Sequence, residues 1–534
     1  MIDVSRPVTR GRIWARLLSV AASAIALPVG AAQPAADSAE RFPIYEFRVL
    51  GNSVLPPATI EAAVYPSLGP DGSLAVVETA RAALVEAYRA AGFGTAFVDI
   101  PEQSVDDGVV RLQVTEGRLD RVRVTGAEYS SIRELRALVP TATRGRTPNL
   151  RTLQSELQAA MRINPDRQVT PLLRAGRTPG TVDMELRVDD APPVHGSLEV
   201  NDRYTADTSE LRANAVLSYD YLFGRPQSLS LQYQWSPEEP GETEVWALSW
   251  VRRSASSPAV WVAYAVDSSS DVAALGTLTV LGQGRIFGAR YVRPAETPAG
   301  WLRAFSLGAD YKDFEEDVRL LDGDQAQTPI SYLLWSAGLT QGRDWSNGSF
   351  SVEHTLSLGL RTLGNTSAEF AFKRFGGRPN FVYLRGNAGI EQRLPWGVTA
   401  ALRSRWQYAP APLIGNEQFG LGGVETVRGY LEAEALVDSG IAGTLELATP
   451  LLRPAGETWP GVRLLAFVDA GVGRIEQPLP RQTAQFDLSS FGAGLAVVRS
   501  PLLDANLGWA RTFVPAERTD AHEDRFHFSF RVGF

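Results

Sequence analysis

Cysteine does not occur in the 534 residues of this chain, and histidine occurs only four times. Without cysteine the chain can form no disulfide, no thiolate metal site and no cysteine nucleophile. The four histidines lack the spacing of a zinc site; they are His195, His354, His522 and His527. An odd spacing in a strand-like segment should place His522 and His527 on opposite faces. The sequence therefore predicts no metal site and no other cofactor.

Lysine is also rare, because the basic residues are almost all arginine and the two lysines are Lys312 and Lys373. The formal net charge is −8, and no strongly basic block interrupts the sequence. This composition argues against a nucleic-acid partner. We find no G-x-S-x-G, H-E-x-x-H or P-loop motif, and no G-x-G-x-x-G between a strand and a helix. The sequence thus predicts a protein that is not an enzyme, with no catalytic residues.

Long apolar runs are missing as well, and the longest apolar stretch belongs to an N-terminal segment, residues 1–32. Four arginines lie between residues 6 and 16, residues 17–29 are mostly apolar, and small residues follow at 30–32. This is the pattern of a cleaved secretory signal peptide. The apolar stretch is too short to cross about 30 Å of hydrocarbon, which argues against a membrane anchor. The remaining chain fits a bacterial envelope protein.

Two α+β modules with the approximate order β-α-α-β-β are predicted at residues 42–118 and 119–191. In the first module we expect a helix over residues 74–91, ended by Gly92. Its apolar stripe is formed by Val77, Leu84 and Tyr88. In the second module a short helix is expected near residues 132–139.

A longer helix is predicted over residues 148–163 of the second module. Thr147 is its predicted N-cap and Pro148 its first residue. Its apolar stripe consists of Leu150, Leu153, Leu157 and Met161. Strands are expected to complete both modules.

From residue 192 to residue 534, apolar side chains alternate with small or polar ones with a period of two. One face carries the aromatic and aliphatic side chains, as in "VWALSW" at 245–250 and "FHFSFRVGF" at 526–534. The other face of the last segment carries His527, Ser529, Arg531 and Gly533. An apolar outer face and a polar inner face are typical of a transmembrane β-barrel, in which an outward Arg531 would cost about 2–4 kcal/mol. At about 21 residues for each strand and its loops, the segment favours sixteen antiparallel strands, with twelve to eighteen left open.

The order of these parts resembles the outer-membrane transporters of two-partner secretion (TpsB proteins of the FhaC/ShlB/HecB type), which share a superfamily with BamA. The resemblance covers nearly the whole chain after the signal peptide. It is carried by "FRVLGNSVL" at 47–55, by residues 88–119 and 162–188, by "FGLGGVETVRGYLE" at 419–432 and by "FVDAG" at 467–471.

The resemblance implies two periplasmic POTRA modules and a barrel in the bacterial outer membrane, in contact with its lipid. It implies secretion of a partner exoprotein of haemolysin or adhesin type, without nucleotide hydrolysis. The POTRA modules would bind this partner by adding a strand to a sheet edge. Alternatives are an insertase or assembly factor of the same superfamily and, from another class, a passive diffusion porin. Residues 33–42 leave little room for the pore-plugging helix that relatives often carry.

The resemblance also assigns a site. Arg428 is expected on a loop near residues 410–432 that folds into the barrel lumen, where Asp469 is its counter-ion. Gly429 would permit close approach to the wall, and Gly471 would leave room for the guanidinium. An arginine can grip a carboxylate with two hydrogen bonds. From the residues alone, an ordinary turn with a solvated arginine is an equal alternative.

Other residues of the motif receive supporting roles. Tyr430 and Phe419 are expected to pack the loop against the wall, and Val427 belongs to the same motif. Three further acidic residues match the family as polar lumen residues: Glu432, Asp438 and Glu446. Phe534 resembles the signal that is read by the barrel-assembly machinery.

Overall fold

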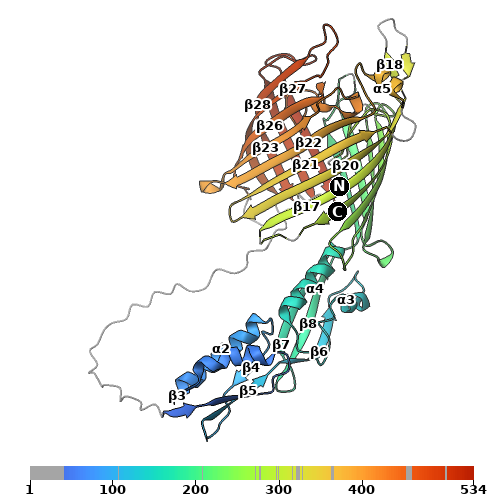
Figure 1. Cartoon of the computed structure of the whole chain (residues 1–534). Helices are drawn as coiled ribbons and strands as arrows, with labels where there is room; N and C mark the ends of the chain where they lie inside the picture. Colours follow the sequence, from blue (N-terminus) through green and yellow to red (C-terminus); the bar gives the residue numbers. More distant parts are fainter. Residues whose placement is uncertain are drawn as a thin grey trace, which may run out of the picture. The chain divides into compact units, whose positions relative to one another are not determined.

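A computed structural model describes residues 41–534 except 106, 207, 271, 276–277, 296, 299, 316, 320–324, 328, 362–365, 453–459 and 500–501. The chain divides into two compact units between Ala191 and Pro192 (Figure 1). Each unit is described by itself. The predicted signal peptide and residues 33–40 lie outside the described part.

The first module of the N-terminal unit is a three-stranded sheet covered by helices. Its elements are β1 (Phe42–Ile44), β2 (Glu46–Leu50), α1 (Pro57–Val64), η1 (Tyr65–Ser67), β3 (Gly69–Gly72), α2 (Leu74–Ala90), β4 (Phe97–Asp99) and β5 (Val109–Thr115). The strand order is β2-β5-β4, with β2 parallel to β5, while β1 pairs with β3. The predicted stripe of Val77, Leu84 and Tyr88 lies in the core. Helix α1 was not located from the sequence, because Ile60 and Val64 alone make too short a stripe.

The second module repeats this arrangement with β6 (Arg118–Thr125), α3 (Ile132–Leu138), α4 (Leu150–Ile163), β7 (Arg167–Ala175) and β8 (Thr181–Asp190). Its strand order is β6-β8-β7. The N-cap of α4 is Asn149 and not Thr147, since Asn149 Oδ1 accepts from the N–H groups of Arg151 and Thr152. A contact between the modules explains this correction: Asn149 Nδ2 donates to the carbonyl of Ala91 at 2.8 Å.

The C-terminal unit is a closed antiparallel barrel, which has sixteen strands in the described residues, as predicted. The strands are β9 (Val194–Asn201), β10 (Arg212–Tyr219), β11 (Gln227–Trp235), β12 (Glu244–Arg252), β13 (Val260–Ser268), β16 (Gly284–Pro294), β17 (Trp301–Phe314), β20 (Ile330–Trp345), β21 (Gly348–Leu360), β22 (Phe381–Arg393), β23 (Thr399–Tyr408), β26 (Ser439–Ala448), β27 (Gly461–Arg474), β28 (Gln485–Arg499), β29 (Leu503–Thr512) and β30 (Asp524–Gly533). Successive strands pair, and β30 closes the ring on β9.

Shorter elements lie in the connections of the barrel. They are η2 (Leu222–Gly224), β14 (Val272–Leu275), β15 (Leu278–Leu281), β18 (Asp317–Arg319), β19 (Gln325–Gln327), α5 (Ser367–Lys373), η3 (Pro395–Gly397), η4 (Gly415–Glu417), β24 (Phe419–Leu421) and β25 (Ala435–Val437). No helix in the described ranges is long and apolar enough to span a bilayer.

The two faces of the barrel wall follow the predicted alternation. Trp246, Leu248 and Phe530 lie exposed on the outside, whereas alternate residues line the lumen. The prediction that His522 lies in a strand-like segment was wrong, because His522 lies in the turn before β30. Strand alternation therefore says nothing about its direction relative to His527.

Two apolar clusters fill part of the lumen. One joins β20 and β22 to the residues that follow β23 and includes Tyr332, Phe381, Leu413 and Ile414. The other surrounds β24 and β25 and includes Phe419, Val427 and Tyr430. Both clusters contain parts of the connection between β23 and β26, so this connection lies inside the barrel.

Candidate functional site: a loop inside the barrel

The connection between β23 and β26, residues 409–438, is called the lumen loop below. Its strands β24 and β25 pair antiparallel from Phe419↔Val437 to Leu421↔Ala435. This hairpin presents the predicted Arg428 at its tip. The loop is therefore a folded structure of its own, and it is longer at both ends than the predicted 410–432.

Arg428 is bound to Asp469 on β27 by two side-chain hydrogen bonds. Its Nε donates to Asp469 Oδ2 at 2.7 Å, and its Nη2 donates to Oδ1 at 2.8 Å. The main-chain N–H of Arg428 also donates to Oδ2, at 3.1 Å. Asp469 is 0% exposed, so its charge is offset by this arginine rather than by water. The structure thus joins the two residues that the resemblance paired.

Two further contacts surround the guanidinium. Arg428 Nη1 donates to Glu446 Oε2 on β26 at 3.2 Å, which gives Glu446 a definite partner. The guanidinium carbon lies 3.3 Å from the ring centre of Phe467, a cation–π contact. A planar, delocalised cation suits this site, because it can stack on a ring and bind two carboxylates at once.

Gly429 brings the backbone of the loop close to the wall, as predicted. Its φ is +92°, and a Cβ there would lie 3.2 Å from Thr512 Cγ2. Gly471 does not act as predicted, because a Cβ there would meet Leu421 at 2.7 Å and Val427 at 2.9 Å. The space beside Gly471 therefore holds apolar loop side chains and not the guanidinium.

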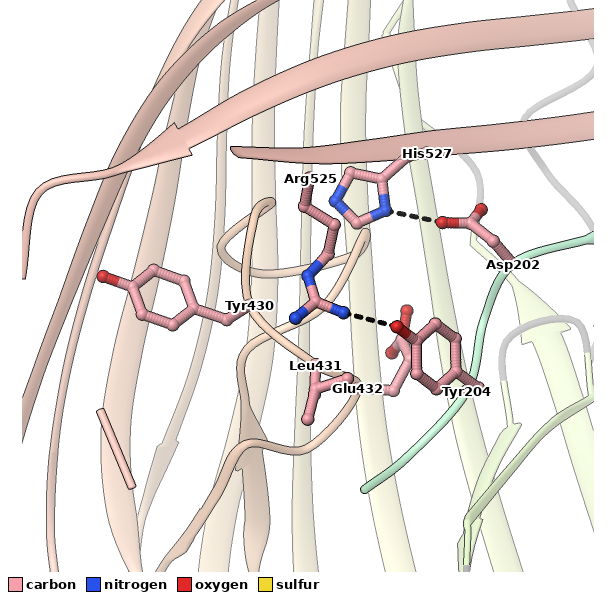
Figure 2. A pocket seen from close by; sticks show the side chains of 7 residues that line it. All are labelled: Asp202, Tyr204, Tyr430, Leu431, Glu432, Arg525 and His527. Atoms are coloured by element: carbon pink, nitrogen blue, oxygen red, sulfur yellow. Dashed lines mark hydrogen bonds and ion pairs between the residues drawn. The ribbon is translucent and has the colours of Figure 1, made fainter. Parts of the chain in front are cut away.

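The last strand holds the Gly429 backbone from both sides. The N–H of Gly429 donates to His527 Nε2 at 2.9 Å, and its carbonyl accepts from Arg525 Nε at 3.1 Å. Figure 2 shows both β30 side chains beside the loop, with His527 directed at Asp202 and Arg525 at Tyr204. His527 Nδ1 lies 2.9 Å from Asp202 Oδ2, and Arg525 Nη1 donates to the Tyr204 hydroxyl at 2.7 Å. Because His527 Nε2 accepts a hydrogen bond from the Gly429 N–H, Nδ1 is the nitrogen that carries the hydrogen and donates to Asp202.

Sequence reasoning gave His527 no role beyond excluding it as a metal ligand. The alternation in the sequence predicts that His527 lies on the inner face of β30. It does not show which loop residue lies opposite. The hydrogen bond to Gly429 depends on how the loop folds inside the barrel.

The other motif residues pack the loop against the wall. Tyr430 is 1% exposed, and its hydroxyl donates to the carbonyl of Val514 at 2.6 Å. Val427 and Phe419 are buried in the apolar cluster around β24. Phe534 lies apart from this site, is 70% exposed and donates its N–H to the carbonyl of Gly196. Its role as an assembly signal stays a prediction.

Two acidic residues do more than line the lumen. Asp438 is 0% exposed and accepts from Arg374 Nη2 at 2.9 Å and from the N–H of Leu413 at 2.9 Å. Arg374 follows α5, so Asp438 connects the lumen loop to the connection between β21 and β22. Glu432 accepts from the N–H of Val424 at 3.0 Å and so holds the tip of the hairpin.

Each of the two compact units contains a match to a family model. Residues 42–117 match the family model described as "POTRA domain, ShlB-type", and residues 317–497 match "Haemolysin secretion/activation protein ShlB/FhaC/HecB". The outer membrane transporter CdiB of Escherichia coli O6:K15:H31 is 24% identical over 66% of this chain and 59% of its own length. The chain thus spans less than two thirds of the length of this relative.

Solved structures show the same fold. CdiB from Escherichia coli has a TM-score of 0.67 at 20% identity, covering 95% of this chain and 93% of its own. CdiB from Acinetobacter baumannii has a TM-score of 0.58 at 16% identity, covering 93% of this chain and 91% of its own.

Proposed function

We propose that this chain secretes a partner exoprotein through its barrel. Its POTRA module and its outer-membrane barrel both resemble those of the two-partner secretion transporters. The observation that carries the proposal is the joint presence of the ShlB-type POTRA module and a sixteen-stranded barrel with its lumen loop. We also propose that the chain has no catalytic activity of its own and uses no nucleotide.

The lumen loop supports this function through the way it is held. Its contacts with the wall are hydrogen bonds, ion pairs and apolar packing, all of which can break and re-form. A polypeptide crossing the lumen requires the loop to shift, and the loop returns when the Arg428–Asp469 pair forms again. In this proposal the pair holds the hairpin tip in its resting position.

The POTRA modules supply the recognition step of the proposal. Edge strands β2 and β4 in the first module, and β6 and β7 in the second, flank their central strands. An edge strand offers main-chain donors and acceptors to an extended segment, while neighbouring side chains select its sequence. We propose that an extended segment of the exoprotein, haemolysin-like or adhesin-like, binds at one of these edges.

Deleting the protein tests this function. We expect the proposed partner exoprotein, sought first among the products of the neighbouring genes, to disappear from the medium and to return when the wild-type chain is supplied. The amount in the medium is measured by immunoblot, and its cellular amount serves as the control for expression. Unchanged secretion in the deletion strain would contradict the proposal.

The two alternatives predict different losses. An assembly factor would lower the amounts of unrelated outer-membrane barrels, which are measured in the same membranes. A passive porin would change the uptake of small solutes and leave the exoprotein in the medium. The proposal requires that the exoprotein alone is affected.

A further inference from the structure

Glu417 lies in the lumen loop, in η4, and its carboxylate is held by three strands of the wall. Lys312 Nζ of β17 donates to Glu417 Oε1 at 2.5 Å. Tyr332 of β20 donates to the same oxygen, and the Tyr383 hydroxyl of β22 donates to Oε2 at 2.7 Å. Glu417 is 1% exposed, so these donors replace the water that an ionised carboxylate requires.

The main chain of Glu417 is held as well. Its carbonyl accepts from Gln407 Nε2 at 3.0 Å and from Arg385 Nη2 at 3.5 Å. Leu413 and Ile414, just before η4, are buried in the apolar cluster with the wall residues of β20 and β22. The first part of the loop is thus bound to the wall by charge, hydrogen bonds and apolar packing together.

This attachment uses different barrel strands from the one at the hairpin tip. Counted around the closed ring from β9, the strands that hold the carboxylate are the seventh, eighth and tenth. The strands that bind Arg428, Gly429 and Tyr430 are the twelfth, thirteenth, fourteenth and sixteenth. In a ring of sixteen strands the eighth and the sixteenth are diametrically opposite, while a single strand separates the tenth from the twelfth.

We propose that Glu417 is a second anchor of the lumen loop, independent of Arg428, and that the loop is a bar fixed at its two ends to separate parts of the wall. The Glu417 contacts are made by Lys312, Tyr332 and Tyr383, none of which contacts the hairpin tip through the bonds described above. Losing one anchor therefore leaves the other end attached. The bar leaves the lumen when both ends are released.

Single-channel recording of the purified full-length chain in planar bilayers tests this. We expect Glu417→Ala and Arg428→Ala, each alone, to raise the open probability only slightly, because the other end of the loop stays attached. The double variant should raise it by about tenfold or more, since the closed state loses both of its attachments. A double variant that behaves like Arg428→Ala alone overturns the proposal, and so does a fully open Glu417→Ala single variant.

A matched control is Glu353 on β21, which faces the lumen and accepts from Asn387 Nδ2 at 3.3 Å. Among the described residues it makes no hydrogen bond or ion pair with the lumen loop. Glu353→Ala in the Arg428→Ala background should add nothing to the current. Folding is checked for every variant by the change in gel mobility on heating. An equal effect of Glu353→Ala would assign the current to lost lumen charge and overturn the anchor.

A charge exchange covers the case in which Glu417→Ala does not fold. Glu417→Lys in the Arg428→Ala background places two ammonium groups together and should open the channel. Adding Lys312→Glu restores opposite charges and should return the open probability toward that of Arg428→Ala. If the exchange does not lower the current, the Lys312–Glu417 contact does not position the loop. These measurements need no substrate, so they stand apart from the test of secretion.

Discussion

Arg428→Ala is expected to reduce secretion of the partner exoprotein by about tenfold or more while the barrel remains in the membrane. The substitution leaves Asp469 fully buried without its cation, and breaking such a pair typically costs about 3–5 kcal/mol. The hairpin tip then loses the position that the pair defines. Arg428→Lys should not restore secretion, because an ammonium cannot form the two parallel bonds that the guanidinium makes with Asp469.

The control for this prediction is Arg403→Ala. Arg403 also faces Glu446, at 3.5 Å, but its side chain is 56% exposed. An exposed pair contributes about 0–1 kcal/mol, so we expect near-normal secretion. Exoprotein in the medium is compared with the amount of folded barrel in the same cells. Normal secretion by Arg428→Ala, or an equal loss in Arg403→Ala, contradicts the role assigned to the pair.

Glu116→Ala is expected to destabilise the first POTRA module by about 1–3 kcal/mol, because several neutral donors lose their charged acceptor. Glu116 is 5% exposed and accepts from the N–H groups of Ser53 and Val54, the latter at 2.9 Å. Tyr88 of α2 donates to the same carboxylate at 3.2 Å. The residue therefore joins the segment before α1 to the last turn of α2. Urea unfolding of the chain, followed by a probe in the N-terminal unit, measures the loss.

The pH dependence of this module follows from the same carboxylate. Burial raises the pKa of Glu116, but the hydrogen bonds from Ser53, Val54 and Tyr88 outweigh it and leave the pKa below its ordinary value of 4.5. A lowered folded-state pKa means that this stabilisation is present above the unfolded value and is lost as the pH falls through the folded one. Glu116→Gln should therefore weaken the loss of stability below about pH 4.5.

Glu86→Ala is the matched control for Glu116. Glu86 lies on the surface of α2 with its side chain 72% exposed, 3.9 Å from Arg89. Its substitution should change the free energy of unfolding by less than about 0.5 kcal/mol. If Glu116→Ala unfolds at the same urea concentration as Glu86→Ala, the carboxylate does not join the two segments as described.

Local patterns predicted much of the fold. Alternation with period two determined the faces of the barrel strands, because lipid and lumen demand opposite side chains. The helical stripe of Val77, Leu84 and Tyr88 likewise placed α2 on its sheet. The predicted start of α4 was wrong because Asn149 also bonds to the other module. A local sequence pattern contains no information about that contact.

The site was less accessible to such reasoning. Alternation places Asp469 in the lumen, but only the family resemblance paired it with Arg428, since the two are joined by a loop fold and not by strand register. Glu417 and His527 were missed for the same reason. Each has its partners on the other side of a folded connection, where no short-range spacing indicates a contact.

The joint between β9 and β30 has a consequence for the order of folding. Every other pair of neighbouring barrel strands is consecutive among the barrel strands in the described residues, whereas this pair joins the first to the last. Its ladder has five residue pairs, from Ser529↔Asn201 to Gly533↔Ser197, against fourteen between β17 and β20. Hairpins can form one after another with little loss of chain entropy, but this contact must close the whole barrel at once. The slowest step of folding is therefore expected at the joint with few main-chain bonds, where Arg525 and His527 also bind the lumen loop.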